Sequence, residues 1–280
     1  MVTHDIRKRL LYSKYLLSRA KNTQAEGSEL AVAVSLPMLH DAVELLMYSV
    51  TDHIGIGSSW NFMDFWGKVK QSGRAEPGHK IPLGQLNDLR VGFKHKWTLP
   101  HSQTVLDLMP RVEAFCEETA RDLLDCDFQK LSLADLISDS DVRQTLSEAE
   151  QELSKGDRAK AFLNVRLAFD KLHRLITNDV ALVRKPHGIE MPNNLLPSKT
   201  VTGIKNLQGV VFNLVDVVNR LMIGIDPVRY RFLMSNTPAV SWTMAGTYQA
   251  LYPHDYSNVS DEVFNKCFGF VVDVALNASR

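Results

Sequence analysis

The sequence predicts an all-α protein in which an antiparallel helical bundle is followed by a second helical unit. Apolar residues recur every three to four positions along successive segments, and no alternating strand pattern is present before residue 200. Short loops separate these segments, as they do in antiparallel bundles. The 280 residues are enough for two domains, and we place them at residues 1–131 and 132–280.

The first two predicted helices differ in their expected surroundings. Residues 3–22 place apolar side chains at near-helical spacing between basic ones, which predicts an amphipathic surface helix. Residues 28–53 are apolar on almost every side, so we expect this helix to be buried at the centre of the bundle. Pro37 is expected to kink this helix, or to restart it after Leu36.

Three further segments complete the predicted bundle. Residues 59–71 form a short helix with Ser59 as its candidate N-cap. Residues 83–95 form a helix that ends in basic residues, and residues 104–127 form a long acidic helix with Pro110 in its first turns. The short helix carries an aromatic cluster, which we assign to the core rather than to base stacking: Trp60, Phe62, Phe65 and Trp66.

The second unit is predicted to begin with a helical hairpin over residues 142–179, which turns at Gly156. Residues 185–203 are rich in proline and asparagine and predict a long loop. Residues 207–224 predict a buried helix, although their valines leave a strand as the alternative. Beyond them we expect a helix over 226–235, a short hairpin or extended lid over 238–252, and a last amphipathic helix over 259–278.

The charge of the chain is balanced overall but segregated along the sequence. Lys plus Arg and Asp plus Glu each number 32, so no whole-molecule field draws the protein to nucleic acid or membrane. Residues 68–96 nevertheless contain seven basic residues against Glu76 and Asp88, whereas residues 101–152 are strongly acidic. Any attraction for an anionic partner must therefore be local.

Cysteine usage and the absence of targeting signals predict a cytoplasmic protein. The three cysteines have no CxxC spacing and leave an odd thiol, which fits a reducing compartment. The basic, amphipathic start has neither the apolar core nor the cleavage site of a signal peptide. We find no apolar run of the length needed to span a bilayer, and we expect no membrane association.

The segment RVGFKHKWTLP combines groups that suit phosphate chemistry. Arg90 offers paired donors for a phosphate, and His95 can accept or donate a proton near neutral pH. The two are five residues apart, about 140° around a helix, so they share a face only if the helix ends or loosens between them. Lys94 and Lys96 oppose charge on the imidazole and favour its neutral form. The structural alternative is a helix that simply ends in cations.

With the helices around it, this motif resembles that of the HEPN superfamily of helical bundles. The resemblance covers residues 1–131 and rests on the stretch LHDAVELLMYSV, a short aromatic helix, the R-x4-6-H pattern of Arg90 and His95, and the long helix that follows. Members with an intact motif are typically metal-independent endoribonucleases of toxin–antitoxin, abortive-infection and RNA-guided phage-defence systems. The resemblance therefore implies RNA as the substrate, a homodimer, no cofactor or metal, and an antitoxin or sensor protein as a further partner.

The resemblance also implies roles for individual residues. His95 activates a ribose 2′-hydroxyl, Arg90 stabilises the phosphorane charge, and the His95 of a paired chain protonates the leaving oxygen. The product is a 2′,3′-cyclic phosphate. Five further residues are expected to support the site or contact RNA: Lys94, Lys96, Asn87, Asp88 and Glu44. Of these, Glu44 is expected to touch Arg90.

Two positions depart from the family pattern. Val91 stands where many nucleases of the family have a polar residue, and Trp97 stands where one branch has a tyrosine that is modified. Regulation through that tyrosine is therefore not expected. A second match to the motif, Arg166 with His173, falls inside one predicted helix, and we interpret it as structural. The alternative to a nuclease is a non-catalytic helical module that docks a protein or an RNA.

One further group has the spacing of metal ligands. His40 and Glu44 are four residues apart on the predicted central helix, with Asp41 beside them, and two ligands at this spacing form a helical metal pair. No third ligand follows at a characteristic spacing. The sequence therefore favours a polar patch within a buried helix.

Overall fold

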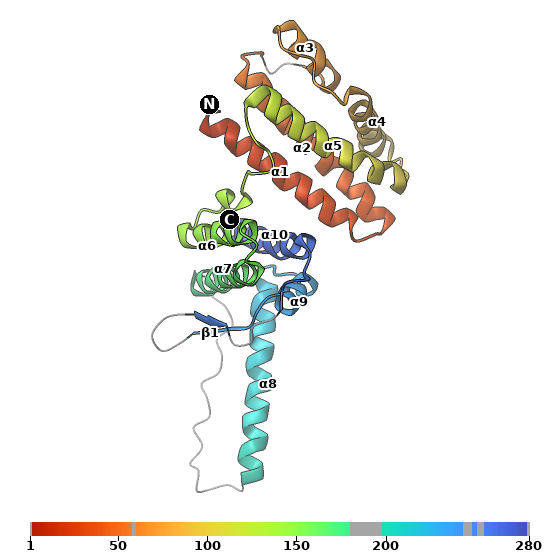
Figure 1. The fold of residues 1–280 in the computed structure, drawn as a ribbon. Coiled ribbons are helices and arrows are strands. Elements are labelled where there is room, and N and C mark those ends of the chain that lie inside the picture. The colour runs from red at the N-terminus through yellow and green to blue at the C-terminus, as the bar shows by residue number, and fades with distance from the viewer. Residues whose placement is uncertain (1, 58–59, 180–197, 243–247, 251–254, 279–280) are drawn as a thin grey trace. The chain divides into compact units, whose positions relative to one another are not determined.

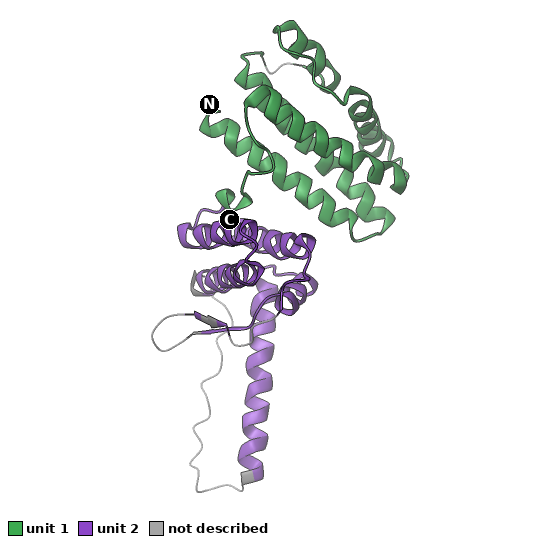
Figure 2. Cartoon of the chain, viewed as in Figure 1, with its two compact units in different colours: residues 1–136 green, residues 137–280 purple. Residues whose placement is uncertain are grey.

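The computed structural model describes residues 2–57, 60–179, 198–242, 248–250 and 255–278. Within these residues the protein is all-α, as predicted, with ten α-helices, two 3₁₀ turns and one two-stranded antiparallel ribbon (Figure 1). The chain divides into two compact units, residues 1–136 and 137–280 (Figure 2).

Unit 1 ends later than the predicted boundary after residue 131, because the next turn still packs on the first helix. Arg7 forms an ion pair of 2.8 Å with Asp135 in that turn. The Lys14 ammonium group donates to the carbonyl of Leu131 at 2.5 Å. The elements of unit 1 are α1 (His4–Gln24), α2 (Glu29–His53), η1 (Phe62–Asp64), α3 (Phe65–Gln71), α4 (Lys80–Lys96), α5 (Ser102–Leu124) and η2 (Leu133–Leu136).

Local signals in the sequence account for where α1 and α2 begin. The Thr3 hydroxyl accepts from the backbone N–H of Ile6, and the Ser28 hydroxyl accepts from that of Ala31, so each helix has an N-cap. The candidate cap Ser59 lies outside the described residues. Helix α2 runs without interruption through Pro37, so the proline does not restart it.

Helix α2 is the central element of unit 1, as its apolar composition predicts. Its buried side chains come from all around the helix, and it packs against α1, α4 and α5. Between α1 and α2, the buried Ser13 hydroxyl donates to the carbonyl of Ala42 at 2.6 Å. Burial of this kind supplies the main driving force for folding of the unit.

The aromatic cluster belongs to the same core, which confirms its assignment from sequence. Phe65 and Trp66 are fully buried, and both rings pack against Phe115 of α5. The Trp66 indole N–H donates to the carbonyl of Gly78 at 3.1 Å, so its polar atom is satisfied.

Helix α2 also passes a simple test of length and hydropathy for a membrane span. The most apolar part of α2 is 61% buried inside the fold, as in the core helix of a globular unit. In the described part of the chain, the pair α8 and α9 passes the same test only when taken together, and the two are bent by 116°.

Unit 2 contains the predicted helical hairpin and the predicted strand hairpin. Its elements are α6 (Ser140–Ser154), α7 (Arg158–Asp179), α8 (Ser198–Met222), α9 (Pro227–Asn236), β1 (Val240–Trp242), β2 (Tyr248–Ala250) and α10 (Asp261–Ala278). The strands pair antiparallel with Val240 opposite Ala250. Residues 243–247 and 251–254 of the predicted hairpin or lid lie outside the described residues.

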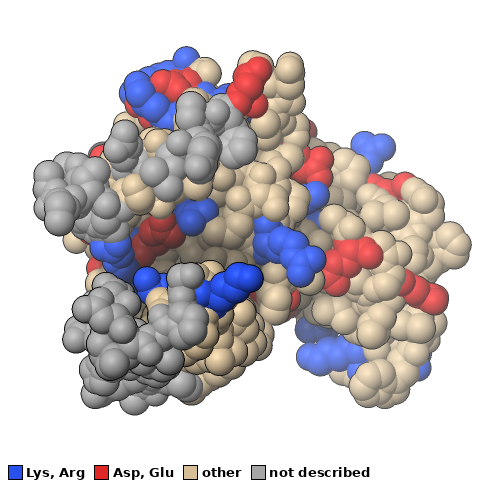
Figure 3. Space-filling model, turned by 90° about the horizontal axis from the view of Figure 1, so that it is seen from below, with Lys and Arg blue, Asp and Glu red and all other residues tan. Residues whose placement is uncertain are grey.

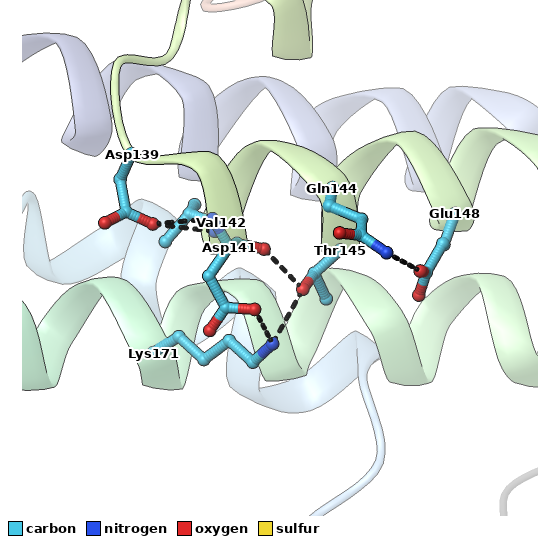
Figure 4. Close-up of polar contacts among 7 residues, drawn as sticks. All are labelled: Asp139, Asp141, Val142, Gln144, Thr145, Glu148 and Lys171. Carbon is cyan, nitrogen blue, oxygen red and sulfur yellow. Dashed lines mark hydrogen bonds and ion pairs between the residues drawn. The ribbon is translucent and has the colours of Figure 1, made fainter.

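Polar contacts define the start of α6 and its pairing with α7. The Asp139 carboxylate accepts from the backbone N–H of Asp141 and of Val142, which caps the helix (Figure 4). Lys171 reaches across from α7 and lies 2.7 Å from the Asp141 carboxylate and 2.9 Å from the Thr145 hydroxyl (Figure 4). These contacts fix the register of the two helices.

Helix α8 corrects two of the sequence predictions. It begins at Ser198, so residues 198–203 of the predicted loop are helical, whereas residues 185–197 lie outside the described residues. Residues 207–224 are not a strand, and they are not a buried helix either. The periodic pattern indicated a helix correctly, but it does not show what covers the apolar face. The exposed apolar residues of α8 are Leu207, Val210, Leu214, Val217, Val218, Leu221 and Met222.

The environments of the three cysteines differ. Burial, with a smaller contribution from Glu117, raises the pKa of Cys116 to about 12. Burial also raises the pKa of Cys267 to about 12. Cys126 is less buried, and its pKa is raised chiefly by burial, with Arg7 opposing the change. The three thiols should therefore differ in reactivity, because the thiolate is the nucleophile.

We predict that a truncation in α2 destabilises unit 1 strongly. Leu46→Ala removes a fully buried side chain and should lower the free energy of unfolding by about 2–5 kcal/mol. Leu30→Ala, on the same helix but 66% exposed, is the matched control and should cost less than about 0.5 kcal/mol. Urea denaturation followed by tryptophan fluorescence measures both. Equal costs for the two variants would contradict the central burial of α2.

We predict that thiol reagents distinguish the cysteines in the folded protein. At pH 8, a disulfide reagent should modify Cys126 first, since a thiol of pKa about 12 is almost entirely protonated there. Cys116 and Cys267 should react only after denaturant is added. Mass spectrometry of the modified peptides identifies each site, and simultaneous modification of all three in the native protein would refute the prediction.

Candidate functional site at helices α2 and α4

The candidate catalytic pair lies on a single unbroken helix. Helix α4 continues to Lys96 and ends where Trp97 adopts the left-handed conformation, with φ of 54°. The Thr98 N–H donates to the carbonyl of Gly92 at 3.2 Å, which closes the helix end. The helix therefore does not loosen between Arg90 and His95, and within one chain the two side chains leave it about 140° apart.

Neither side chain of the pair is engaged by another residue that the structure describes. Arg90 is half-buried and His95 is exposed. Among the described residues, no hydrogen bond or ion pair is made by either. The guanidinium of Arg90 and the imidazole of His95 are therefore available to a ligand or to a second chain.

The expected contact between Glu44 and Arg90 is absent from the described residues. The Glu44 carboxylate instead lies 3.6 Å from the imidazole Nδ1 of His40, one turn earlier on α2. The prediction was wrong because sequence spacing does not reveal which neighbouring helix a side chain faces. Glu44 therefore belongs to the surroundings of His40.

The remaining supporting residues fall into two groups. Lys94, Lys96 and Asp88 are exposed on α4, where they can reach a ligand in solvent. Asn87 is half-buried, and its side-chain oxygen lies 3.2 Å from Nε2 of His40. Asn87 thus links α4 to the polar group on α2.

The two positions that differ from the HEPN pattern are both at the surface. Val91 is 36% exposed and Trp97 is 84% exposed. Trp97 therefore offers an accessible indole beside His95, not a hydroxyl that could be modified.

The basic segment around α4 is mostly without internal partners. Lys70 and Lys80 both approach the carboxylate of Glu76, at 4.0 and 3.5 Å. In the described part of the chain, the other basic residues of 68–96 form no ion pair: Lys68, Arg74, Arg90, Lys94 and Lys96. Unpaired cations of this kind attract anions at short range.

On the face drawn in Figure 3, basic and acidic side chains are interspersed with uncharged ones. This mixing agrees with the zero formal charge of the chain.

His40 is a buried titratable group on α2. It is 2% exposed, and its ring stacks on Phe62 with centroids 4.5 Å apart. Its Nδ1 has no hydrogen-bond partner, although it lies 3.6 Å from Glu44 and 3.7 Å from Asp41. Sequence spacing identified the three residues, but it could not show the contacts with Phe62 and Asn87, which come from other segments.

A groove of about 830 Å³ lies between α4 and α5. Pro82 and Gln85 of α4 line it, together with residues of α5 between Thr104 and Ala114. Arg90 and His95 are not part of its lining, so this groove does not unite the candidate pair.

The second match to the motif is engaged within α7. Arg166 forms an ion pair with Asp170 at 3.1 Å, and His173 stacks on Phe169. Burial raises the pKa of Asp170, and the guanidinium of Arg166 opposes that change. These contacts agree with a structural role for Arg166 and His173.

Comparison of the chain with protein-family models, with curated proteins and with solved structures found no match.

Proposed function

We propose that unit 1 is a HEPN-type domain and that the protein is a metal-independent endoribonuclease of a phage-defence or toxin–antitoxin system. The observation that carries the proposal is the state of Arg90 and His95. Both have no hydrogen-bond or ion-pair partner among the described residues, and the same holds for Lys94 and Lys96 at the end of the same helix. A guanidinium without a carboxylate partner keeps its paired N–H donors free for a phosphate.

The proposed reaction uses the two groups as base and electrostatic stabiliser. The neutral imidazole of His95 takes the proton of a ribose 2′-hydroxyl, and the 2′-oxygen forms a bond to the adjacent phosphorus. Paired N–H donors of Arg90 stabilise the charge that develops on the phosphoryl oxygens. The bond to the 5′-oxygen breaks, that oxygen takes a proton, and the products are a 2′,3′-cyclic phosphate and a 5′-hydroxyl.

The intact helix α4 is the reason for proposing a homodimer. The angle of about 140° between the two side chains directs them to different sides of one helix. A twofold axis beside α4 brings two copies of each group to one groove, so the His95 of the partner can protonate the leaving oxygen. Each chain then contributes both a guanidinium and an imidazole.

The biological setting follows from the proposed chemistry. A nuclease that cuts cellular RNA acts in the cytoplasm and must be kept silent, so an antitoxin or sensor protein is the proposed partner. Lys94, Lys96 and Asp88 are exposed on the same helix as His95, and they are the proposed RNA-contacting residues.

The second candidate function is a non-catalytic docking module. The exposed apolar residues of α8 favour it, because large exposed apolar areas mark interaction surfaces. In that case Arg90 only supports packing, and the protein binds a partner without cutting RNA.

We predict that His95→Ala removes cleavage from a folded protein. The loss of the base should lower the cleavage rate of total cellular RNA by about 100-fold or more. Arg90→Ala should lower it by about 100- to 1,000-fold. The assay is run in EDTA, and a ligation that requires 2′,3′-cyclic phosphate ends detects the product. Circular dichroism confirms that each variant is folded.

His101→Ala is the matched control, because His101 is also exposed and close in sequence but outside the motif. It should cleave at the wild-type rate. Cleavage that survives His95→Ala, or that EDTA abolishes, would contradict the nuclease assignment. A stable partner complex without cleavage under any condition would support the docking module instead.

A further inference from the structure

Three potential metal ligands meet on one side of α2. The imidazole Nδ1 of His40 lies 3.6 Å from Oε2 of Glu44 and 3.7 Å from Oδ1 of Asp41. One donor atom from each of the three residues lies within 4.8 Å of the others. The donor set is therefore one nitrogen and two carboxylate oxygens.

The surroundings of His40 determine which of its nitrogens faces this group. The amide oxygen of Asn87 lies 3.2 Å from Nε2 and can only accept a hydrogen bond, so Nε2 carries the hydrogen. In the neutral imidazole, Nδ1 then presents its lone pair. Stacking on Phe62 holds the ring in this orientation. The ring is thus prearranged by groups from η1 and α4.

The lone pair of Nδ1 faces the negative charge of two carboxylates. Nδ1 is buried and makes no hydrogen bond to any residue that the structure describes. Within the described residues, no lysine or arginine lies within 4.0 Å of the carboxylates of Asp41 or Glu44. A buried acceptor without a partner costs free energy, and two carboxylates beside it add repulsion. A cation between the three donors removes both costs.

We propose that His40, Asp41 and Glu44 bind a divalent transition-metal ion of the Zn²⁺ class. An imidazole nitrogen with two carboxylates suits Zn²⁺ and its first-row neighbours, whereas Mg²⁺ and Ca²⁺ favour oxygen alone. Nitrogen–oxygen separations of 3.6 and 3.7 Å fit ligands that each lie about 2.0–2.2 Å from one ion. The side chains of Asp41 and Glu44 are 52% and 33% exposed, so they can rotate to close the site.

Asn87 has a positioning role in this site. A histidine that binds metal usually donates its other ring N–H to an oxygen, which fixes the tautomer and the ring orientation. Asn87 provides that oxygen from α4, so the ion would strengthen the contact between α2 and α4. The ion takes no part in the RNA cleavage proposed above, and its binding is measured without RNA.

The test is calorimetric titration of the metal-free protein with Zn²⁺. The wild-type chain should bind one ion that Glu44→Gln and Asp41→Asn each weaken by about tenfold or more, since both changes remove a ligand charge and keep the shape. Asn87→Ala should weaken binding by about 10- to 100-fold. The same titration with Mg²⁺ should show no binding at this site.

His53→Ala is the matched control, because His53 is an exposed histidine at the end of the same helix. It should bind Zn²⁺ as the wild type does. Binding that is equally strong in Glu44→Gln and His53→Ala, or no binding by the wild type, would overturn the proposal.

The state of the His40 imidazole gives an independent readout that a change in folding would not mimic. In ¹⁵N NMR spectra, Nε2 should be protonated and Nδ1 should shift on addition of Zn²⁺. An imidazole protonated on both nitrogens, with shifts that Zn²⁺ leaves unchanged, would indicate a simple ion pair of His40 with the two carboxylates and would contradict the metal site.

Discussion

The burial of helix α2 on nearly all its sides is the constraint on which the rest of unit 1 depends. An apolar helix at the centre requires the other helices to pack around it, and it requires partners for every polar group it carries. At the contact with α1, the Ser13 hydroxyl of that helix donates to the α2 carbonyl of Ala42. On α2 itself, His40 has a hydrogen-bond partner at only one ring nitrogen, because Nε2 faces the side-chain oxygen of Asn87. The unsatisfied nitrogen is therefore informative, because buried polar atoms without partners are rare and call for an explanation.

Helix α4 connects this polar group to the candidate catalytic pair. Asn87 turns toward His40, Arg90 is half-buried one turn later, and His95 is exposed near the helix end. One face of the helix is thus committed to packing, whereas the opposite face is exposed to solvent. Because the proposed metal site lies at the packed face of α4 and His95 is exposed, the proposed metal binding and the proposed RNA cleavage are independent. The ion acts on the α2–α4 contact, and the nuclease chemistry requires groups that the ion does not touch.

Much of the fold could be predicted from sequence, because it depends on local signals. Periodicity located the helices, and the aromatic cluster with Phe65 and Trp66 is in the core as assigned. Contacts between distant segments could not be predicted in this way. The partner of Glu44 is His40 rather than Arg90, since the facing of two helices depends on packing. The exposure of α8 was missed for the same reason. For the candidate pair, the sequence placed Arg90 and His95 on a helix, but it could not show whether their side chains share a face.

Arg90 and His95, held on different faces of one unbroken helix, are proposed to act where two chains meet. Cross-linking of His95→Cys by a bis-maleimide in a Cys126→Ser background tests this geometry without knowledge of the RNA. If two copies of position 95 share a groove, a reagent that spans the groove should give a covalent dimer rapidly. A position that is likewise exposed but lies outside α4, probed by Glu26→Cys in the same background, should not cross-link. A monomer that fails to cross-link through position 95, at concentrations where RNA is cut, would contradict the claim.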